Sequence, residues 1–329
     1  MLILLSLLFP LAAGPLARAV TARVEPRLAT WLMTAGALLL AGTSCGALGL
    51  LVLSELVRMP TLARLGHWSS AIVAAGGLPG GWTSLAAGIV LGAALLAAAS
   101  FAVRRGRALA DAGRHARDLP GRDRLVVTED AAADAYAVPG RPGRIVVSAG
   151  MLGALDAAGR AALLAHERAH LSGRHHWFTG VARLAAAANP LVRPLAEAVE
   201  YTVERWADEA AAAAVGDRHL VARAIASAAL ASKATRPHRT VFASLGAVFS
   251  GQAAAAIRRR IPRRAGDPLS TAGPVPRRVA ALLAPAPRAG LPALVLSLLF
   301  LGGAALCALG AADHLQDLIS FAHASAEQR

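Results

Sequence analysis

The residues best suited to chemistry in this sequence are two histidines four positions apart, with a glutamate directly after the first. His166, Glu167 and His170 form an H-E-x-x-H pattern in a segment predicted to be helical. Residues four apart lie on one face of a helix, so both imidazoles can reach a single Zn²⁺ ion. Glu167 would then lie beside the metal, where it can take a proton from bound water. The pattern predicts one zinc site per chain that activates water.

A third zinc ligand is expected from a second predicted helix downstream. Glu204 and Asp208 are four residues apart there, so their carboxylates share one helical face. Glu200 precedes Glu204 by four residues on the same helix and is the alternative ligand. We favour Glu204 because only this glutamate is followed by the Ala207-Asp208 pair.

Six further histidines are not expected to bind the metal. His175 and His176 follow His170 by five and six residues, away from the metal-facing positions, so we expect them to support a ligand or to lie at the surface. Four more have no partner pattern and are expected to be solvated: His67, His115, His219 and His238.

Short strands are expected just before the zinc helix. Segments 124–128 and 144–148 are rich in β-branched residues, 134–138 is a third strand candidate, and a Pro-Gly turn separates the last two. A protease needs a strand edge there to bind an extended peptide. We assign this role to Ala135, Tyr136 and Ala137. From 156 to 230 the pattern becomes helical, with Asp156 as the expected N-cap residue.

The composition divides the chain into apolar ends and a charged middle. Hydrophobic residues make up 56% of the sequence and the mean hydropathy is +0.50, too apolar for an ordinary soluble domain. The net charge of +14 could favour nucleic acid, but most basic residues lie between Arg104 and Arg288, and we read them as marking the cytoplasmic side of a membrane protein. We therefore expect a lipid bilayer, and no nucleic acid, as partner. The two cysteines, Cys45 and Cys307, lie in apolar runs and cannot build the metal site.

Four segments are expected to span the membrane, at about 1–17, 28–53, 82–103 and 291–312. No positive charge precedes Arg18, so the first is read as a retained span rather than a signal peptide. Arginines cluster between the first two spans, after the third and before the fourth. The positive-inside rule then puts residues 104–290 in the cytoplasm and both termini outside.

The expected organisation is an α+β membrane protein. Residues 1–103 hold three transmembrane helices, and 104–232 form a mainly helical zinc-peptidase domain with a small β-sheet. A basic, proline-rich linker is expected at 233–290, the fourth span at 291–312 and a short tail at 313–329.

Taken together, these residues resemble the gluzincin metallopeptidases of membranes, both the HtpX type and the BlaR/MecR type. Residues 135–152 resemble the strand segment of the HtpX group. The Ala-Asn-Pro-Leu-Val run at 188–192 is similar to the N-P-L signature of the BlaR/MecR group, and three spans, a zinc domain and one further span is that group's layout. The resemblance covers about residues 1–230 and the last span.

The resemblance implies roles for individual residues. His166, His170 and Glu204 become the zinc ligands, Glu167 the general base and Asp208 the carboxylate that orients a ligand histidine. Ala207 departs from the BlaR/MecR pattern, which usually has cysteine there. Only residues 313–329 follow the last span, without an S-x-x-K motif, so direct β-lactam sensing is not expected.

The expected function is a membrane-anchored zinc endopeptidase that cleaves protein substrates at the cytoplasmic face. By resemblance to BlaR/MecR proteins, a repressor of the BlaI/MecI type is a candidate substrate. The alternatives are an HtpX-like quality-control protease and a signalling receptor that binds without cleaving. The intact H-E-x-x-H pattern argues against the receptor, because binding alone does not need Glu167.

Overall fold

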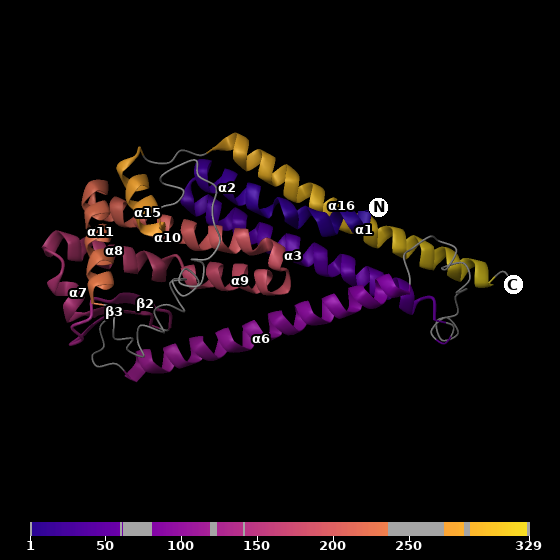
Figure 1. Ribbon diagram of the computed structural model, residues 1–329, viewed down its shortest axis with the longest axis horizontal. Coiled ribbons are helices and arrows are strands. Elements are labelled where there is room, and N and C mark those ends of the chain that lie inside the picture. The colour runs from indigo at the N-terminus through magenta and orange to yellow at the C-terminus, as the bar shows by residue number, and fades with distance from the viewer. Residues whose placement is uncertain are drawn as a thin grey trace.

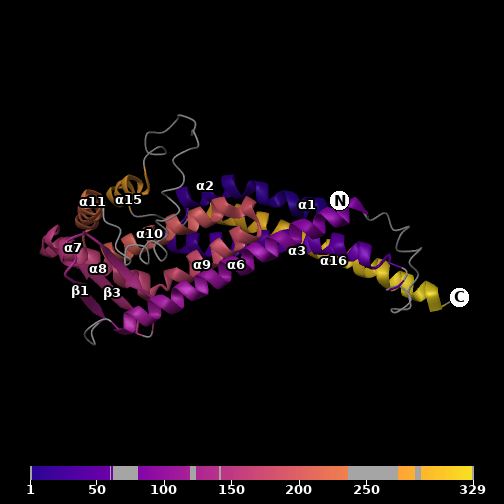
Figure 2. The same ribbon diagram turned by 60° about the horizontal axis from the view of Figure 1, so that its bottom comes forward.

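Four apolar helices dominate the computed structural model, which describes residues 2–59, 61, 81–118, 124–140, 142–235, 273–285 and 290–327. Each is long and apolar enough to cross a membrane: Leu2–Arg23, α3 (Pro26–Leu56), α6 (Trp82–Asp118) and the part Leu291–Asp313 of α16 (Leu291–Glu327). They run side by side along a long molecule whose small sheet lies at the end away from both termini (Figures 1 and 2). The prediction of about four such helices is confirmed.

The first apolar segment is irregular, as its prolines predict. It consists of α1 (Leu2–Leu8), the 3₁₀ turn η1 (Phe9–Ala12) and α2 (Ala13–Arg23). Pro10 lies in the first positions of the turn, where its missing N–H is tolerated. Phe9 packs edge-on against Phe300 of α16, with ring centroids 5.1 Å apart.

Helix α6 joins the membrane part to the sheet. Its 37 residues correspond to a length of about 55 Å, and the helix continues past the arginines that follow its apolar half. Near its C-terminal end, Ala112 and Ala116 pack against Tyr136 and Val146 of the sheet. One continuous helix thus carries a candidate span and covers one face of the sheet (Figure 2).

The sheet has three strands in the described residues: β1 (Leu125–Thr128), β2 (Ala135–Val138) and β3 (Arg144–Ser148). The order is β1-β3-β2, with β1 parallel and β2 antiparallel to β3. All five residues of β3 are buried, as expected for the central strand. Each strand lies where the sequence predicts it, and β2 forms one edge of the sheet.

Seven helical segments follow or return to the sheet: α7 (Ala149–Gly153), α8 (Ala157–Ser172), α9 (His175–Ala188), η2 (Pro190–Val192), α10 (Arg193–Val215), α11 (Arg218–Ala234) and α15 (Pro274–Leu283). Asp156 caps α8 as predicted, because its carboxylate accepts a hydrogen bond from the amide of Gly159 at 2.7 Å. Leu163 and Leu171 on α8 pack with Ile145 and Val147 on the sheet face opposite α6.

The hairpin formed by α9, η2 and α10 packs among the spans. Phe178 on α9 meets Trp31 of α3 with centroids 4.7 Å apart, and Asn189 at the hairpin tip donates a hydrogen bond of 2.9 Å to the hydroxyl of Ser44. Leu195 and Val199 of α10 are completely buried in the same core. Helix α9 thus packs chiefly on α3 and α10.

The structure also differs from the expected linker at 233–290. Residues 236–272 lie outside the described part of the chain, but Pro274–Leu283 form helix α15. Its prolines occupy the first turn, where proline is compatible with a helix, and Leu282 is buried against α11. Helix α16 continues to Glu327, through the expected tail.

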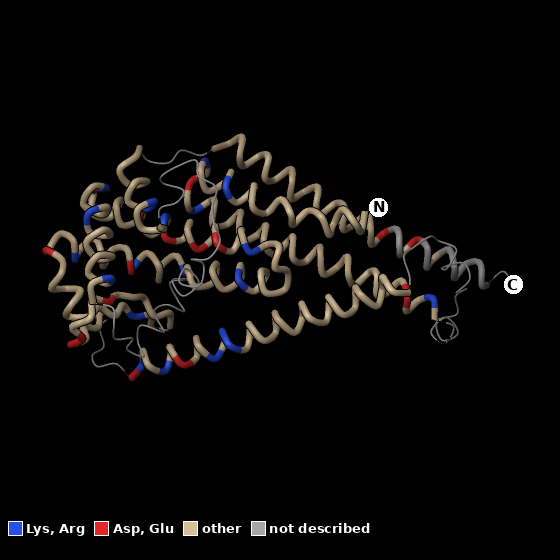
Figure 3. The backbone as a smooth tube through the Cα atoms, in the orientation of Figure 1, with Lys and Arg blue, Asp and Glu red and all other residues tan. Residues whose placement is uncertain are grey.

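Charged residues are distributed as a membrane protein requires. They concentrate at the sheet end and at the opposite end of α3 and α6, and the apolar lengths of the helices between them carry few (Figure 3). The fold is therefore an α+β membrane protein with a mainly helical domain and a small sheet, as predicted.

Candidate metal centre

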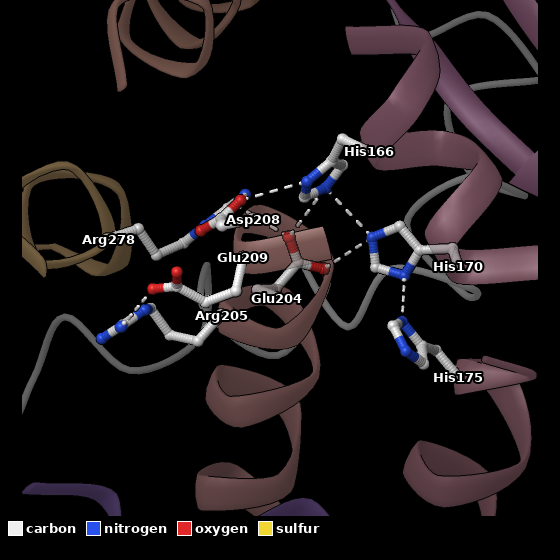
Figure 4. A network of polar contacts seen from close by, with 8 residues as sticks. All are labelled: His166, His170, His175, Glu204, Arg205, Asp208, Glu209 and Arg278. Atoms are coloured by element: carbon white, nitrogen blue, oxygen red, sulfur yellow. Dashed lines mark hydrogen bonds and ion pairs between the residues drawn. The ribbon is translucent and has the colours of Figure 1, made fainter. Parts of the chain in front are cut away.

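Helices α8 and α10 cross so that three metal-binding side chains converge. The Nε2 atoms of His166 and His170 are 3.1 Å apart, and they lie 3.6 and 3.7 Å from the two carboxylate oxygens of Glu204. All three residues can direct one ligand atom into a common space, with those atoms within 4.8 Å of one another. The structure thus brings together the three residues that the sequence predicts as ligands (Figure 4).

The separations fit a tetrahedral zinc ion. Ligand atoms at bond lengths of about 2.1 Å and tetrahedral angles lie about 3.4 Å apart. The two histidine nitrogens are 3.1 Å apart, and each lies 3.6 or 3.7 Å from a different oxygen of Glu204, which is close to this value. Two histidines and one glutamate also form a donor set that zinc prefers in catalytic sites, where the fourth position is left to water or substrate. Zinc is therefore the metal that this group of residues would hold.

The second nitrogen of each ligand histidine has a neighbour that fixes the ring. Nδ1 of His166 lies 3.0 Å from a carboxylate oxygen of Asp208, which is completely buried. Such an outer carboxylate orients the imidazole and increases its basicity, the role expected for Asp208.

His175 orients the ring of His170 in a similar way. The two Nδ1 atoms are 3.0 Å apart, and the ring of His175 is buried beside Trp206. Arg174 adopts a left-handed conformation with φ of 49°, which turns the chain between α8 and α9. Gly173 is required in this turn, because a Cβ atom there would lie 2.3 Å from Nε2 of His175. Of the two roles left open for His175, support of a ligand fits its position.

Arg278 of α15 is part of the site and was not anticipated from the sequence. Its guanidinium donates to both oxygens of Asp208, at 2.8 and 2.6 Å, and its Nη1 lies 2.8 Å from Glu204. The side chain is almost fully buried, with 10% exposed. A signal was present in the helical spacing of the apolar residues Val275, Val279 and Leu282, together with two prolines in the first turn. That signal indicates a helix there, although not its contact with α10.

The charges around the ligands favour a cation in the middle of the group. Burial alone would raise the pKa of Glu204, but Arg278 and the ligand histidines lower it far below its usual range. Burial lowers the pKa of His170 to about 4, so this imidazole is neutral and able to bind a metal at neutral pH. For His166, the carboxylates of Asp208 and Glu204 outweigh burial and raise the pKa to about 10. Without a metal, the His166 imidazole therefore holds an additional proton at neutral pH.

Glu167 has the environment of a proton carrier. It is buried, with 7% of its surface exposed, one residue after the predicted ligand His166. Burial raises its pKa to about 7, near the value at which a carboxylate can both accept and release a proton at neutral pH.

The alternative residues lie elsewhere. Glu200 pairs with Arg183 at 2.6 Å and is not part of the convergent group. Ala135, Tyr136 and Ala137 lie on the edge strand β2, which packs against α8, and the Tyr136 side chain is buried toward α6. Helix α8 therefore carries two residues of the metal group and also packs against the edge strand.

Comparison with known families bears on the class of this site. Residues 103–182 match the model of peptidase family M48. The matched stretch contains the sheet and α8, with His166, Glu167 and His170, and it ends before α10 and Glu204. No curated protein and no solved structure matches the chain.

The M48 match and the convergent His–His–Glu group indicate a membrane-associated zinc metallopeptidase. The sequence-based resemblance is confirmed at this level, since the M48 family includes zinc peptidases of the HtpX type. The finer likeness to the BlaR/MecR group stays a prediction.

Replacing Glu204 with alanine is expected to abolish stable zinc binding, because it removes one of the three predicted protein ligands. Purified wild-type protein should contain one zinc per chain, measured by mass spectrometry of the metal, and Glu204→Ala should contain almost none. Glu200→Ala is the matched control on the same helix, since its carboxylate pairs with Arg183 and not with the ligands. Zinc lost from Glu200→Ala but retained by Glu204→Ala would move the third ligand to Glu200.

Proposed function

We propose that this protein is a zinc-dependent endopeptidase, anchored in a membrane, that hydrolyses protein substrates at the cytoplasmic face. The observation that carries the proposal is the convergence of His166, His170 and Glu204 beside the buried carboxylate of Glu167. A site that only binds zinc for structure has four protein ligands and no need of an adjacent base. Three ligands and a base are the parts of a hydrolytic centre.

The chain's own residues supply the remaining steps of peptide hydrolysis. Zinc bound here would polarise the scissile carbonyl and lower the pKa of water to about 7. The carboxylate of Glu167 takes a proton from the attacking water and delivers it to the leaving amine. Asp208 and His175 hold the two ligand rings in place, and Arg278 keeps Glu204 and Asp208 ionised. These contacts hold the site rigid before substrate arrives.

Strand β2 is proposed to bind the substrate backbone. It forms the edge of the sheet in the described residues and packs against α8, which carries both ligand histidines. An extended peptide can add to such an edge through main-chain hydrogen bonds, and this mode recognises backbone more than sequence. The residues proposed for this contact are Ala135, Tyr136 and Ala137.

The two candidate substrate classes rest on different observations. Cleavage of a BlaI/MecI-type repressor rests on the sequence resemblance alone. A quality-control role of the HtpX kind is favoured by one structural observation, the packing of the α9–η2–α10 hairpin among the spans, which holds the metal centre close to the ends of α2 and α3. Membrane proteins with damaged segments near the bilayer surface would be within reach of such a centre.

Activity is tested on the full-length protein purified in detergent. Cleavage of an unfolded generic substrate such as casein should be abolished by a chelator and restored by an equimolar amount of Zn²⁺. Fragments ending inside the substrate chain identify an endopeptidase, whereas release of single residues from one end would contradict that class. A zinc-loaded protein that binds but never cleaves would favour the receptor.

The orientation is tested with a reporter fused after Ala231 in α11. The arginines that flank the spans predict that this position is cytoplasmic. A reporter that is active only in the cytoplasm should give signal there, while one that is active only outside should be silent. The reverse pattern would put the metal centre on the outer face of the membrane.

A further inference from the structure

A small polar pocket lies at the junction of α2, α3 and α10, apart from the metal centre. Its volume is about 150 Å³, room for several water molecules and thus for one phosphate-sized group. The residues that give it chemical character are Thr21, Arg23, Pro26, Tyr201, Thr202 and Arg205.

The pocket lies at the level where three apolar helices end. Arg23 is the last residue of α2, and Pro26 is the first of α3. Gly290, directly before α16, approaches so closely that a Cβ atom there would lie 2.1 Å from the carbonyl oxygen of Arg23. The three ends meet at the side of the molecule that carries α10 and α15 (Figure 1). If the helices span a bilayer, this is the depth of its head groups.

The pocket carries positive charge that the described contacts compensate only in part. Arg205 donates from Nη2 to Glu209 at 3.1 Å, but its Nε atom is buried without a hydrogen-bond partner in the part of the chain that the structure describes. Glu209 also forms an ion pair with Arg218, so its charge is divided between two arginines. Arg23 is exposed at the mouth. A buried N–H donor on a cationic side chain is best satisfied by an oxygen anion.

Surrounding groups add to the preference for an anion. Arg277 of α15 lies over the ring of Tyr201, 4.4 Å from its centroid, on the same side of α10. The Thr30 hydroxyl bonds to Thr202 at 2.9 Å and ties α3 to α10 under the pocket. The acidic residue Glu25 lies in the connector between α2 and α3, but it does not line the pocket.

We propose that this pocket binds the phosphate group of an anionic phospholipid, with Arg23 and Arg205 as the recognising side chains. Arginine suits this task because its planar fork donates several hydrogen bonds to phosphate oxygens. Basic pockets between membrane helices at the cytoplasmic surface are suited to acidic lipid head groups. Tyr201 and Arg205 also flank Glu204 on α10, so a bound head group would steady the helix that supplies the third metal ligand. This site does not depend on the proposed peptidase activity.

The test uses the full-length protein, delipidated and reconstituted with a mixture of phosphatidylglycerol and phosphatidylcholine. Native mass spectrometry should show one retained phosphatidylglycerol per chain, with a preference of about tenfold or more over phosphatidylcholine. Arg23→Gln and Arg205→Gln should each reduce this preference at least severalfold. Arg18→Gln is the matched control, because Arg18 is exposed on the same helix but does not line the pocket. Unchanged zinc content in each variant establishes that it has folded.

A second measurement separates a lipid from free phosphate. Inorganic phosphate, titrated into protein held in phosphatidylcholine nanodiscs, should raise the melting temperature less than phosphatidylglycerol at equal occupancy. Full protection by inorganic phosphate without retained phosphatidylglycerol would keep the phosphate site and identify the free anion as its ligand. The proposal is overturned if wild-type protein shows no preference for either probe, or if Arg18→Gln loses the preference as fully as the pocket variants do.

Discussion

Replacing Glu167 with glutamine is expected to lower kcat by about 10²–10⁴-fold while the zinc content stays at one per chain. Glutamine has nearly the same size as glutamate and fits the buried position, but it cannot accept a proton from water. The ligand residues His166, His170 and Glu204 are unchanged, so metal binding should persist. Kinetics on an unfolded protein substrate and metal analysis of the same preparation measure both quantities.

The matched control for this variant is Glu129→Gln, which makes the same chemical change at an exposed position after β1. It should keep wild-type activity. Full activity in Glu167→Gln would show that another group moves the proton, and loss of zinc along with activity would show that Glu167 has a structural role at the ligands. Either result would exclude the mechanism proposed for the buried carboxylate.

Replacing Arg278 with glutamine is expected to destabilise the chelator-treated protein by about 3–5 kcal/mol. The guanidinium contacts both oxygens of Asp208 and one of Glu204, so its removal leaves these two carboxylates to rely on the His166 imidazolium for compensation. In thermal denaturation of the full-length protein, this corresponds to a fall in Tm on the order of 10 °C. Added zinc should recover part of the loss, because the ion is itself a positive partner for Glu204.

Arg277 is the natural control for this experiment, since it is the neighbour of Arg278 on α15 but is exposed and lies over the ring of Tyr201. Arg277→Gln should change the free energy of unfolding by no more than about 1 kcal/mol. Equal stability of Arg278→Gln and wild type would mean that α15 is not needed to hold the carboxylates, and the assignment of Arg278 to the metal centre would be wrong.

The parts of the site that could be predicted are those encoded by local spacing. The interval between His166 and His170 fixes both rings on one face of α8, and the same interval relates Glu204 to Asp208 on α10. Two short segments rich in β-branched residues, and a third that precedes a Pro-Gly turn, also predict their strands, because these signals act over a few positions. Such features need no knowledge of what packs against them.

Arg278 could not be predicted because its role depends on a contact across 70 positions of sequence. The local pattern there favours a short helix, but an arginine is normally on a solvent-facing side, and only the carboxylates of α10 justify its burial. The packing of α9 could not be predicted for a related reason. Its apolar residues indicate burial, while the choice of α3 rather than α8 as chief partner depends on Trp31 and Ser44, far away in the chain.

The α9–η2–α10 hairpin has a consequence for how the peptidase half can be isolated. Leu195 and Val199 of α10 are buried against the same core as Met33 and Leu40 of α3. A fragment cut at residue 104 would leave these side chains facing water, and burying each is worth about 1.5–3 kcal/mol. We therefore expect no stable water-soluble catalytic fragment from this protein. Helix α3, a candidate membrane span, therefore also completes the core of the peptidase half, so substitutions within this span should disturb the peptidase half as well.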